Sequence, residues 1–204
     1  EDGTGRLFVA DSYNCRVLIF DVNTITDGEN AVNVLGQTNF TSGSSATTQN
    51  RMAYAYGIDY SSITQRLFVG DGWNNRILVF DVAAVTDGEN AINVLGQTNF
   101  TGTGSSTNQN RMNYSCGLTL DDSANRLFAT DMYNSRVLIF DVSSTTITNG
   151  MNAVSVAGQT DGAGSAVFNT GNTYDGAPSK GLDYPYDVVL DTTAHRLFVA
   201  DFNA

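Results

Sequence analysis

The sequence predicts an all-β protein, a β-propeller of four-stranded antiparallel blades, and three observations support this fold class. The segment Arg6–Asp11 returns almost unchanged at 66–71, 126–131 and 196–201. Each repeated segment is rich in Val, Ile, Leu, Phe and Tyr and is bounded by Gly, Asn, Asp or Ser, which is typical of short strands joined by turns. No pattern with the helical period is long enough for a helix. Tandem groups of four such strands are typical of propeller blades, and a solenoid, which usually places one strand per turn, is the weaker alternative.

One complete repeat contains four predicted strands, which we call a, b, c and d. They occupy residues 54–59, 66–71, 76–82 and 93–101. A short turn joins a to b. The turn between b and c contains Asn, which tolerates the left-handed backbone of a tight turn. Strands b and c are apolar on both faces, so each sheet has to be covered on both sides, as stacked blades allow.

The repeats divide the chain into four predicted units of one partial propeller. Residues 1–53 supply strands b, c and d of one blade, and residues 54–113 form a complete blade. Residues 114–183 form a second complete blade with a longer loop, and residues 184–204 supply strands a and b of the next. We expect about three and a half blades, which is fewer than the four or more that a closed propeller has.

The combined motif resembles the NHL-repeat propellers, in the bacterial type with long repeats. Strand a reads Tyr-Pro-Tyr-Asp-Val-Val-Leu-Asp at 184–191, and strand b reads Arg-Leu-Phe-Val-Ala-Asp. Tyr-Asn-x-Arg-Val-Leu-Ile-Phe follows at 13–20, and Val-Leu-Gly-Gln closes the unit. The resemblance implies a closed ring of about six blades. It also implies a rigid binding platform, with a minority of lyases and other enzymes on similar propellers.

The chain departs from this resemblance in two ways. The proline of strand a occurs only at Pro185, since Ala55 and Ser115 stand at the equivalent positions. The strands are also too few for a ring. We therefore expect these residues to belong to a longer chain, and association of copies through open blade edges is the alternative.

The charge excludes nucleic acid as a partner. The chain has 10 Lys and Arg against 21 Asp and Glu, a formal net charge of −11 and a pI near 4.2. Phosphate backbones are bound by basic surfaces, which this sequence lacks. Its apolar runs are also far shorter than the ~20 residues that span a bilayer, so no membrane insertion is expected.

An Asp, an Asn and an Arg recur where strand b ends and strand c begins. We expect the Asp to accept backbone N–H groups of the intervening turn and to pair with the Arg, as a structural lock of the turn. A catalytic role is disfavoured because an enzyme needs one site, whereas these residues occur in every repeat. The predicted lock residues are Asp11, Asn14, Arg16, Asp71, Asn74, Arg76, Asp131, Asn134 and Arg136.

No catalytic residue, metal site or cofactor is predicted. The acidic turns at 27–30 and 87–90 offer fewer oxygens than the six to eight that calcium needs, and the third copy has lost both carboxylates. The single histidine, His195, lies in a predicted surface turn and is too little for a nucleophilic triad or most zinc sites.

The predicted binding residues are aromatic and basic side chains on one face of the propeller. Strand b ends and strand a begins on the same side of a blade, so the b–c turns and the long d–a loops share that face. Aromatic rings among amide and hydroxyl groups suit a protein or a glycan, although the tyrosines could instead only wedge between blades. The candidates are Tyr13, Trp73, Tyr133, Tyr54, Tyr114, Tyr184, Arg51, Arg111 and Lys180.

The sequence therefore favours a non-catalytic binding scaffold with a protein or glycan partner. Two alternatives stay open: a propeller enzyme of the lyase or lactonase kind whose catalytic residues lie outside this segment, and a self-assembling structural protein. The scarcity of Lys and the wealth of Asn, Thr, Ser and Gly favour a location outside the cell or on its surface.

Overall fold

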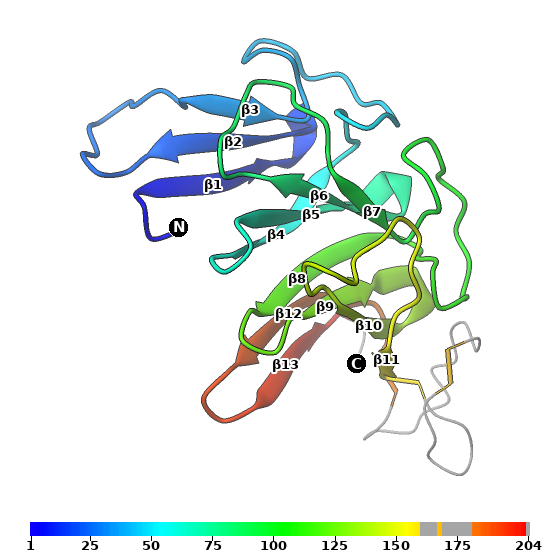
Figure 1. The fold of residues 1–204 in the computed structure, drawn as a ribbon. Helices are drawn as coiled ribbons and strands as arrows, with labels where there is room; N and C mark the ends of the chain where they lie inside the picture. The colour runs from blue at the N-terminus through cyan, green and yellow to red at the C-terminus, as the bar shows by residue number, and fades with distance from the viewer. Residues whose placement is uncertain (160–166, 169–180, 203–204) are drawn as a thin grey trace.

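The computed structural model describes residues 1–159, 167–168 and 181–202, which form four antiparallel sheets (Figure 1). In this part of the chain there is no α-helix, and no helix that could cross a bilayer. The first two sheets comprise β1 (Arg6–Asp11), β2 (Arg16–Asp21) and β3 (Asn33–Leu35), then β4 (Ala55–Ser61), β5 (Arg66–Asp71), β6 (Arg76–Asp81) and β7 (Asn93–Leu95). The third and fourth comprise β8 (Ser115–Asp121), β9 (Arg126–Asp131), β10 (Arg136–Asp141) and β11 (Ser155–Ala157), then β12 (Pro185–Asp191) and β13 (Arg196–Asp201).

The sheets are arranged as successive propeller blades. Within each sheet the strands lie in chain order, so that every strand pairs with the next one. Neighbouring sheets contact each other through their first strands, β1 with β4, β4 with β8 and β8 with β12. The sheets lie side by side in chain order, with their first strands together (Figure 1). The predicted fold class, an all-β partial propeller with four-stranded antiparallel blades, is confirmed.

The b–c turns share one conformation, a short 3-10 turn that ends in a left-handed residue. These turns are η1 (Ser12–Asn14), η2 (Gly72–Asn74) and η3 (Met132–Asn134). The left-handed residue is Asn75 in the second sheet, as the sequence predicts for an asparagine, with a φ of 53°. Cys15 and Ser135 take the same φ of 53° in the other two copies.

The first strand of each later blade is irregular near its start. The register between β4 and β5 shifts between Ala55 and Ile58, and β8 and β12 show the same irregularity against β9 and β13. Such bulges redirect side chains. Gly57 lies in this irregular part of β4, where a Cβ would come within 2.3 Å of the Cys116 carbonyl oxygen. The glycine therefore lets the backbones of β4 and β8 approach closely.

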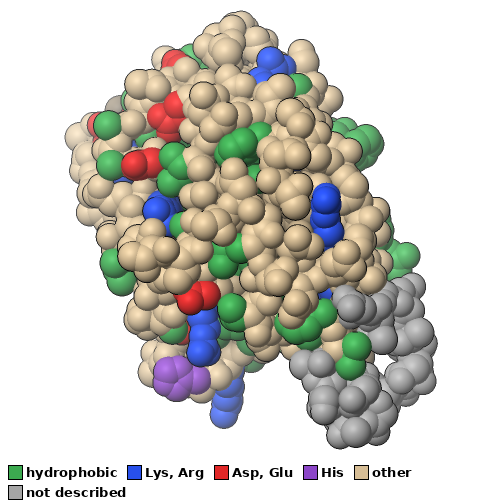
Figure 2. Space-filling model, turned by 45° about the vertical axis from the view of Figure 1, so that its right-hand side comes forward, with side chains coloured by type: hydrophobic (Ala, Val, Ile, Leu, Met, Phe, Trp, Pro, Cys, Tyr) green, Lys and Arg blue, Asp and Glu red, His purple; other side chains and the backbone are tan. Residues whose placement is uncertain are grey.

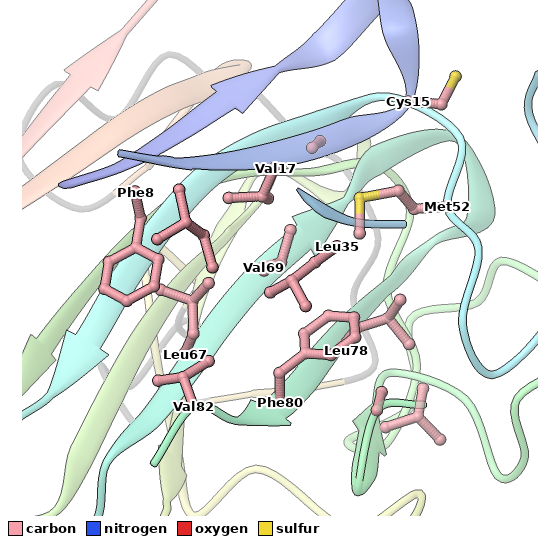
Figure 3. Packing of buried hydrophobic residues seen from close by; sticks show 14 residues of the cluster. Phe8, Cys15, Val17, Leu35, Met52, Leu67, Val69, Leu78, Phe80 and Val82 are labelled. Carbon is pink, nitrogen blue, oxygen red and sulfur yellow. The ribbon is translucent and has the colours of Figure 1, made fainter. Parts of the chain in front are cut away.

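Two apolar clusters fill the spaces between the first three sheets. The cluster between the first and second sheets is drawn in Figure 3, where Val17, Leu67 and Phe80 lie near one another. The cluster between the second and third sheets contains Phe68 and Leu138. Because side chains alternate along a strand, Leu67 and Phe68 of β5 enter different clusters. The second sheet is thus covered on both faces, as its apolar strands require.

Candidate functional site

Aromatic side chains form a continuous band where the b–c turns meet the starts of the next blades. Each ring has its centroid within 6.2 Å of another ring of the band. We call this set the aromatic band, and its members are Tyr13, Tyr54, Tyr56, Trp73, Tyr114, Tyr133 and Tyr184.

The first part of the band joins the first three sheets. The ring of Tyr13, in η1, meets Tyr54 edge-on at 5.5 Å. Tyr54 stacks on Trp73, with centroids 4.6 Å apart and planes at 18°. The indole Nε1 of Trp73 then donates to the Tyr114 hydroxyl at 3.0 Å. Turn aromatics therefore reach the tyrosine at the start of the following blade.

The second part continues to the fourth sheet. Tyr114 and Tyr133 have centroids 5.0 Å apart, and Tyr133 meets Tyr184 edge-on at 5.6 Å. Tyr56 contributes a hydroxyl 2.6 Å from that of Tyr114, and its ring stacks on Tyr54 at 6.2 Å. The hydroxyl of Tyr114 consequently links two neighbouring rings by hydrogen bonds.

Three tyrosines of the band have a backbone conformation that side chains rarely adopt. Tyr54, Tyr114 and Tyr184 have φ values of 65°, 69° and 60°, each just before the first strand of its sheet. A left-handed non-glycine residue costs about 1–2 kcal/mol. Tyr114 is held there in part by Asn75, whose Oδ1 accepts its backbone N–H at 2.8 Å.

The turn members of the band face solvent, and the band carries no formal charge. Tyr13 is 84% exposed, Trp73 59% and Tyr133 44%, whereas the other members are half-buried. Burial raises the pKa of the Tyr56 phenol, as does its hydrogen bond with Tyr114. Burial also raises the pKa of Tyr114, so both phenols stay protonated at neutral pH. On the face drawn in Figure 2, charged side chains are scattered rather than gathered into one patch.

The predicted binding residues divide into two groups in the structure. The six predicted aromatic residues all belong to the band, but two predicted arginines contact their own loops. Arg51 donates to the Ser44 carbonyl at 2.7 Å, and Arg111 donates to the Gln97 side chain. Lys180 lies outside the described residues. The assignment of all these residues to ligand binding stays a prediction.

The Asp, Asn and Arg of each b–c turn contact one another. In the second sheet, Arg76 Nε lies 2.7 Å from Asp71 Oδ2, and Asn74 donates to the same oxygen at 2.9 Å. The antiparallel register places Asp71 directly opposite Arg76. Their side chains are fully buried, with no exposed area.

One detail of the expected lock is wrong, because Asp71 does not accept a backbone N–H of its turn. The N–H that it accepts belongs to Ala53, at 2.7 Å, in the segment before β4. The 3-10 turn satisfies its own backbone by a hydrogen bond from the Asn75 N–H to the Gly72 carbonyl. The Asp71 carboxylate therefore accepts from the segment before β4 instead.

Arg76 also ties together the long loops that flank its sheet. Its Nη2 donates to the carbonyls of Thr48 and Arg51, at 3.0 and 2.8 Å, in the loop before the sheet. Its Nη1 donates to the Phe100 carbonyl in the loop that follows. Arg136 makes equivalent contacts with the loop residues Thr107, Asn108, Arg111 and Phe168. We propose that these residues serve the scaffold rather than a ligand.

Stability should fall as the pH rises from about 4 to about 6. Burial raises the pKa of Asp71 to about 6, against the opposing effect of Arg76, and it does the same for Asp131 beside Arg136. Between the ordinary value of 3.8 and this raised pKa, the folded chain holds more protons than the unfolded one. The free energy of unfolding therefore decreases as the pH rises through this window.

Urea denaturation at pH 4.5, 5.5 and 6.5 measures this effect. Repulsion among the surface charges of an acidic chain acts in the same direction, and salt screens it. The fall should therefore persist in 0.5 M NaCl, since the two carboxyls are buried. Constant or rising stability in salt would contradict the assignment.

In two blades, a residue of the turn between strands c and d accepts a backbone N–H of the preceding sheet. Asp87 Oδ1 accepts the Val34 N–H at 3.1 Å, so the second sheet's turn contacts the first sheet's outer strand. Asn149 accepts the Val94 N–H at 3.1 Å in the next blade. Among the described residues, no group of three or more His, Cys, Asp or Glu could hold a metal ion.

Some residues that shape this face were not predicted from the sequence. Asn75 positions Tyr114, and its Nδ2 also donates to the Thr103 carbonyl at 2.8 Å. The buried Gln97 joins the same turn to the following loop, through the carbonyls of Asn75 at 3.0 Å and Gly104 at 2.9 Å. The Val-Leu-Gly-Gln motif, which is identical at 34–37 and 94–97, was a signal for the glutamine.

Comparison with known proteins gives a likeness in fold. No protein-family model matches the chain, and neither does any curated protein. Among solved structures, it is similar to those of U3-55K and of the RRP9 WD40 repeats. Each has a TM-score of 0.49 and 14% identity, over 76% of this chain and 36% of the other. The chain thus spans about a third of those two chains, and the propeller assignment rests on its own sheets.

Proposed function

We propose that the chain is a non-catalytic binding module whose aromatic band contacts a partner protein. The observation that carries this proposal is the exposure of Tyr13, Trp73 and Tyr133 at three successive blades. Tyr and Trp are enriched at protein interfaces, because they offer a large apolar surface together with a polar tip. Each of the three turns carries an Asp–Arg ion pair, buried in the second and third sheets and partly exposed in the first, and a fixed turn reduces the ordering cost of binding.

The ring orientations favour a protein over a glycan. Tyr54 and Trp73 stack on each other and so cover part of each other's faces. Tyr13 and Tyr133 meet their neighbours edge-on, at 70° and 83°. The exposed rings therefore do not lie in one plane, and the side chains of a protein can fill such an uneven aromatic surface.

Two finer proposals rest on the sequence. The Arg-Leu-Phe-Val-Ala-Asp and Tyr-Asn-x-Arg motifs support an NHL-type propeller rather than another propeller family. The composition, rich in Asn, Thr, Ser and Gly and poor in Lys, supports a location outside the cell.

Loss of the exposed rings should weaken the binding of selected peptides. A displayed library of random peptides is selected against the wild-type chain, and the peptides are then tested on the triple variant Tyr13→Ser, Trp73→Ser, Tyr133→Ser. We expect affinity to fall at least tenfold, because hot-spot aromatics contribute about 2 kcal/mol or more each.

A matched control removes three exposed apolar side chains elsewhere. Ile25, Ile63 and Val154 are 74%, 65% and 59% exposed and lie outside the band. Their joint replacement by Ser should leave peptide affinity unchanged. Equal losses in both triple variants, or binding of a glycan array in place of peptides, would overturn the proposal of a protein partner.

A further inference from the structure

A pocket of about 250 Å³ lies where the first strands of the blades converge. The irregular starts of three strands contribute pairs of residues to its wall, and the end of β1 with η1 adds Ala10 and Ser12. The pocket adjoins the aromatic band, since Tyr56 belongs to both. The three pairs are Tyr56 and Gly57 of β4, Cys116 and Gly117 of β8, and Tyr186 and Asp187 of β12.

Asp187 breaks the repeat at this pocket. Gly57 and Gly117 are the residues at the equivalent positions of the other two blades. A Cβ at Gly117 would lie 2.5 Å from Asp187 Oδ1, so the carboxylate lies directly against the next blade. A side chain present in one blade only is not required by the scaffold that all blades share.

One oxygen of this carboxylate is available to a ligand. Oδ1 accepts the Val188 N–H at 2.9 Å. Within the described part of the chain, no donor forms a hydrogen bond with Oδ2. Asp187 is exposed, and no Lys or Arg lines the pocket.

The other polar groups of the pocket are neutral. The Cys116 thiol is buried, which together with the negative charge of Asp187 raises its pKa to about 12. The Tyr56 phenol also stays protonated, and its hydroxyl is fixed by Tyr114. Asp187 is therefore the one charged side chain of the described pocket wall, which it shares with Tyr56 and Tyr186, in a chain whose net charge is −11.

We propose that this pocket binds the guanidinium group of an arginine side chain from the partner protein. A guanidinium donates to a carboxylate oxygen and also stacks on aromatic rings, whereas the lysine ammonium acts as a point charge. The volume is below the ~300–1,000 Å³ of sites for whole small molecules, which suits one inserted side chain. The inference rests on the proposed function and names the chemistry that it recognises.

The test compares two probes that differ in charge. Nα-acetyl-arginine amide and its neutral analogue Nα-acetyl-citrulline amide are titrated into the 15N-labelled 204-residue chain, and amide chemical shifts are followed. We expect saturable shifts at Gly57, Gly117 and Val188, with the arginine probe binding at least tenfold more tightly. Added salt should weaken its binding, as for a charge pair near the surface.

Variants supply a second comparison. Asp187→Asn keeps the shape of the side chain and should weaken arginine binding at least tenfold. Asp27→Asn removes the same charge in an exposed turn on the outer side of the first sheet, and should leave binding unchanged. If Asp187→Asn does not fold, the comparison of the two probes on the wild-type chain decides.

The outcomes separate this inference from the proposed function. Equal binding of both probes, or shifts confined to amides remote from the pocket, would overturn the arginine site. If the band variant still loses its peptides in that case, the proposed function stands. If the arginine probe binds as expected but the triple variant of Tyr13, Trp73 and Tyr133 still binds its peptides, the pocket remains a guanidinium site. The proposal that the aromatic band binds a partner protein is then wrong.

Discussion

Replacing Arg76 with methionine is expected to lower the free energy of unfolding by about 3–5 kcal/mol, the loss typical of a broken buried ion pair. The fully buried carboxylate of Asp71 would lose its charged partner. The carbonyls of Thr48, Arg51 and Phe100 would lose their donors as well. Urea denaturation at pH 7.5 measures the change. The loss should be smaller at pH 5, where the unpaired carboxyl can take up a proton.

Arg16→Met is the matched control in the first sheet. Arg16 Nε lies 2.7 Å from Asp11 Oδ2, but the two side chains keep 15% and 25% of their surface exposed. Water can therefore solvate Asp11 after the substitution, and a loss of about 1 kcal/mol is expected. If Arg76→Met and Arg16→Met cost the same, burial is not what makes these pairs important.

The fold was predictable because its information is local and repeated. Short apolar segments, turn residues and the spacing between them recur in each blade, so one correct interpretation applies to all. The left-handed turn residue was predictable at Asn75 for the same reason, since asparagine tolerates that conformation. Cys15 and Ser135 carry no such signal, but they take the same conformation, and their backbone N–H groups close the same 3-10 turn.

The aromatic band was predictable in membership but not in geometry. Residues 60 apart in the sequence, such as Tyr13 and Trp73, take equivalent places in successive blades, so a shared face follows from the repeat. The stack of Trp73 on Tyr54 and the hydrogen bond to Tyr114 depend on how the blades are rotated against each other. Sequence spacing does not specify that rotation.

The arginines and the pocket show where sequence reasoning fails. Arg51 and Arg111 lie in the predicted loops, but their side chains donate to oxygens of the protein itself. Arg51 donates to a backbone carbonyl and Arg111 to a side-chain amide. The pocket between the first strands depends on the irregular starts of those strands, which no residue pattern in the sequence predicts. Asp187 did offer a signal, because it replaces a glycine of the other two repeats. A repeat protein is therefore best searched for ligand sites where its copies differ.

The second large effect is expected at Phe68, whose replacement by alanine should cost about 3–5 kcal/mol. Phe68 is fully buried between the second and third sheets, where Ile77, Leu138 and Phe140 belong to the same cluster. Removal of the ring would leave a cavity that the rigid strands on both sides could close only in part. Thermal and urea denaturation measure the loss.

Phe128→Ala makes the same chemical change one blade later, and the sequence alone treats the two positions alike. Phe128 is only partly buried, and it lies in β9, beside the fourth sheet. A loss of about 1–2 kcal/mol is expected, because a partly exposed ring gives up less surface to water. Equal losses at the two positions would mean that the third sheet is covered as completely as the second, and that the burial described for Phe128 is wrong.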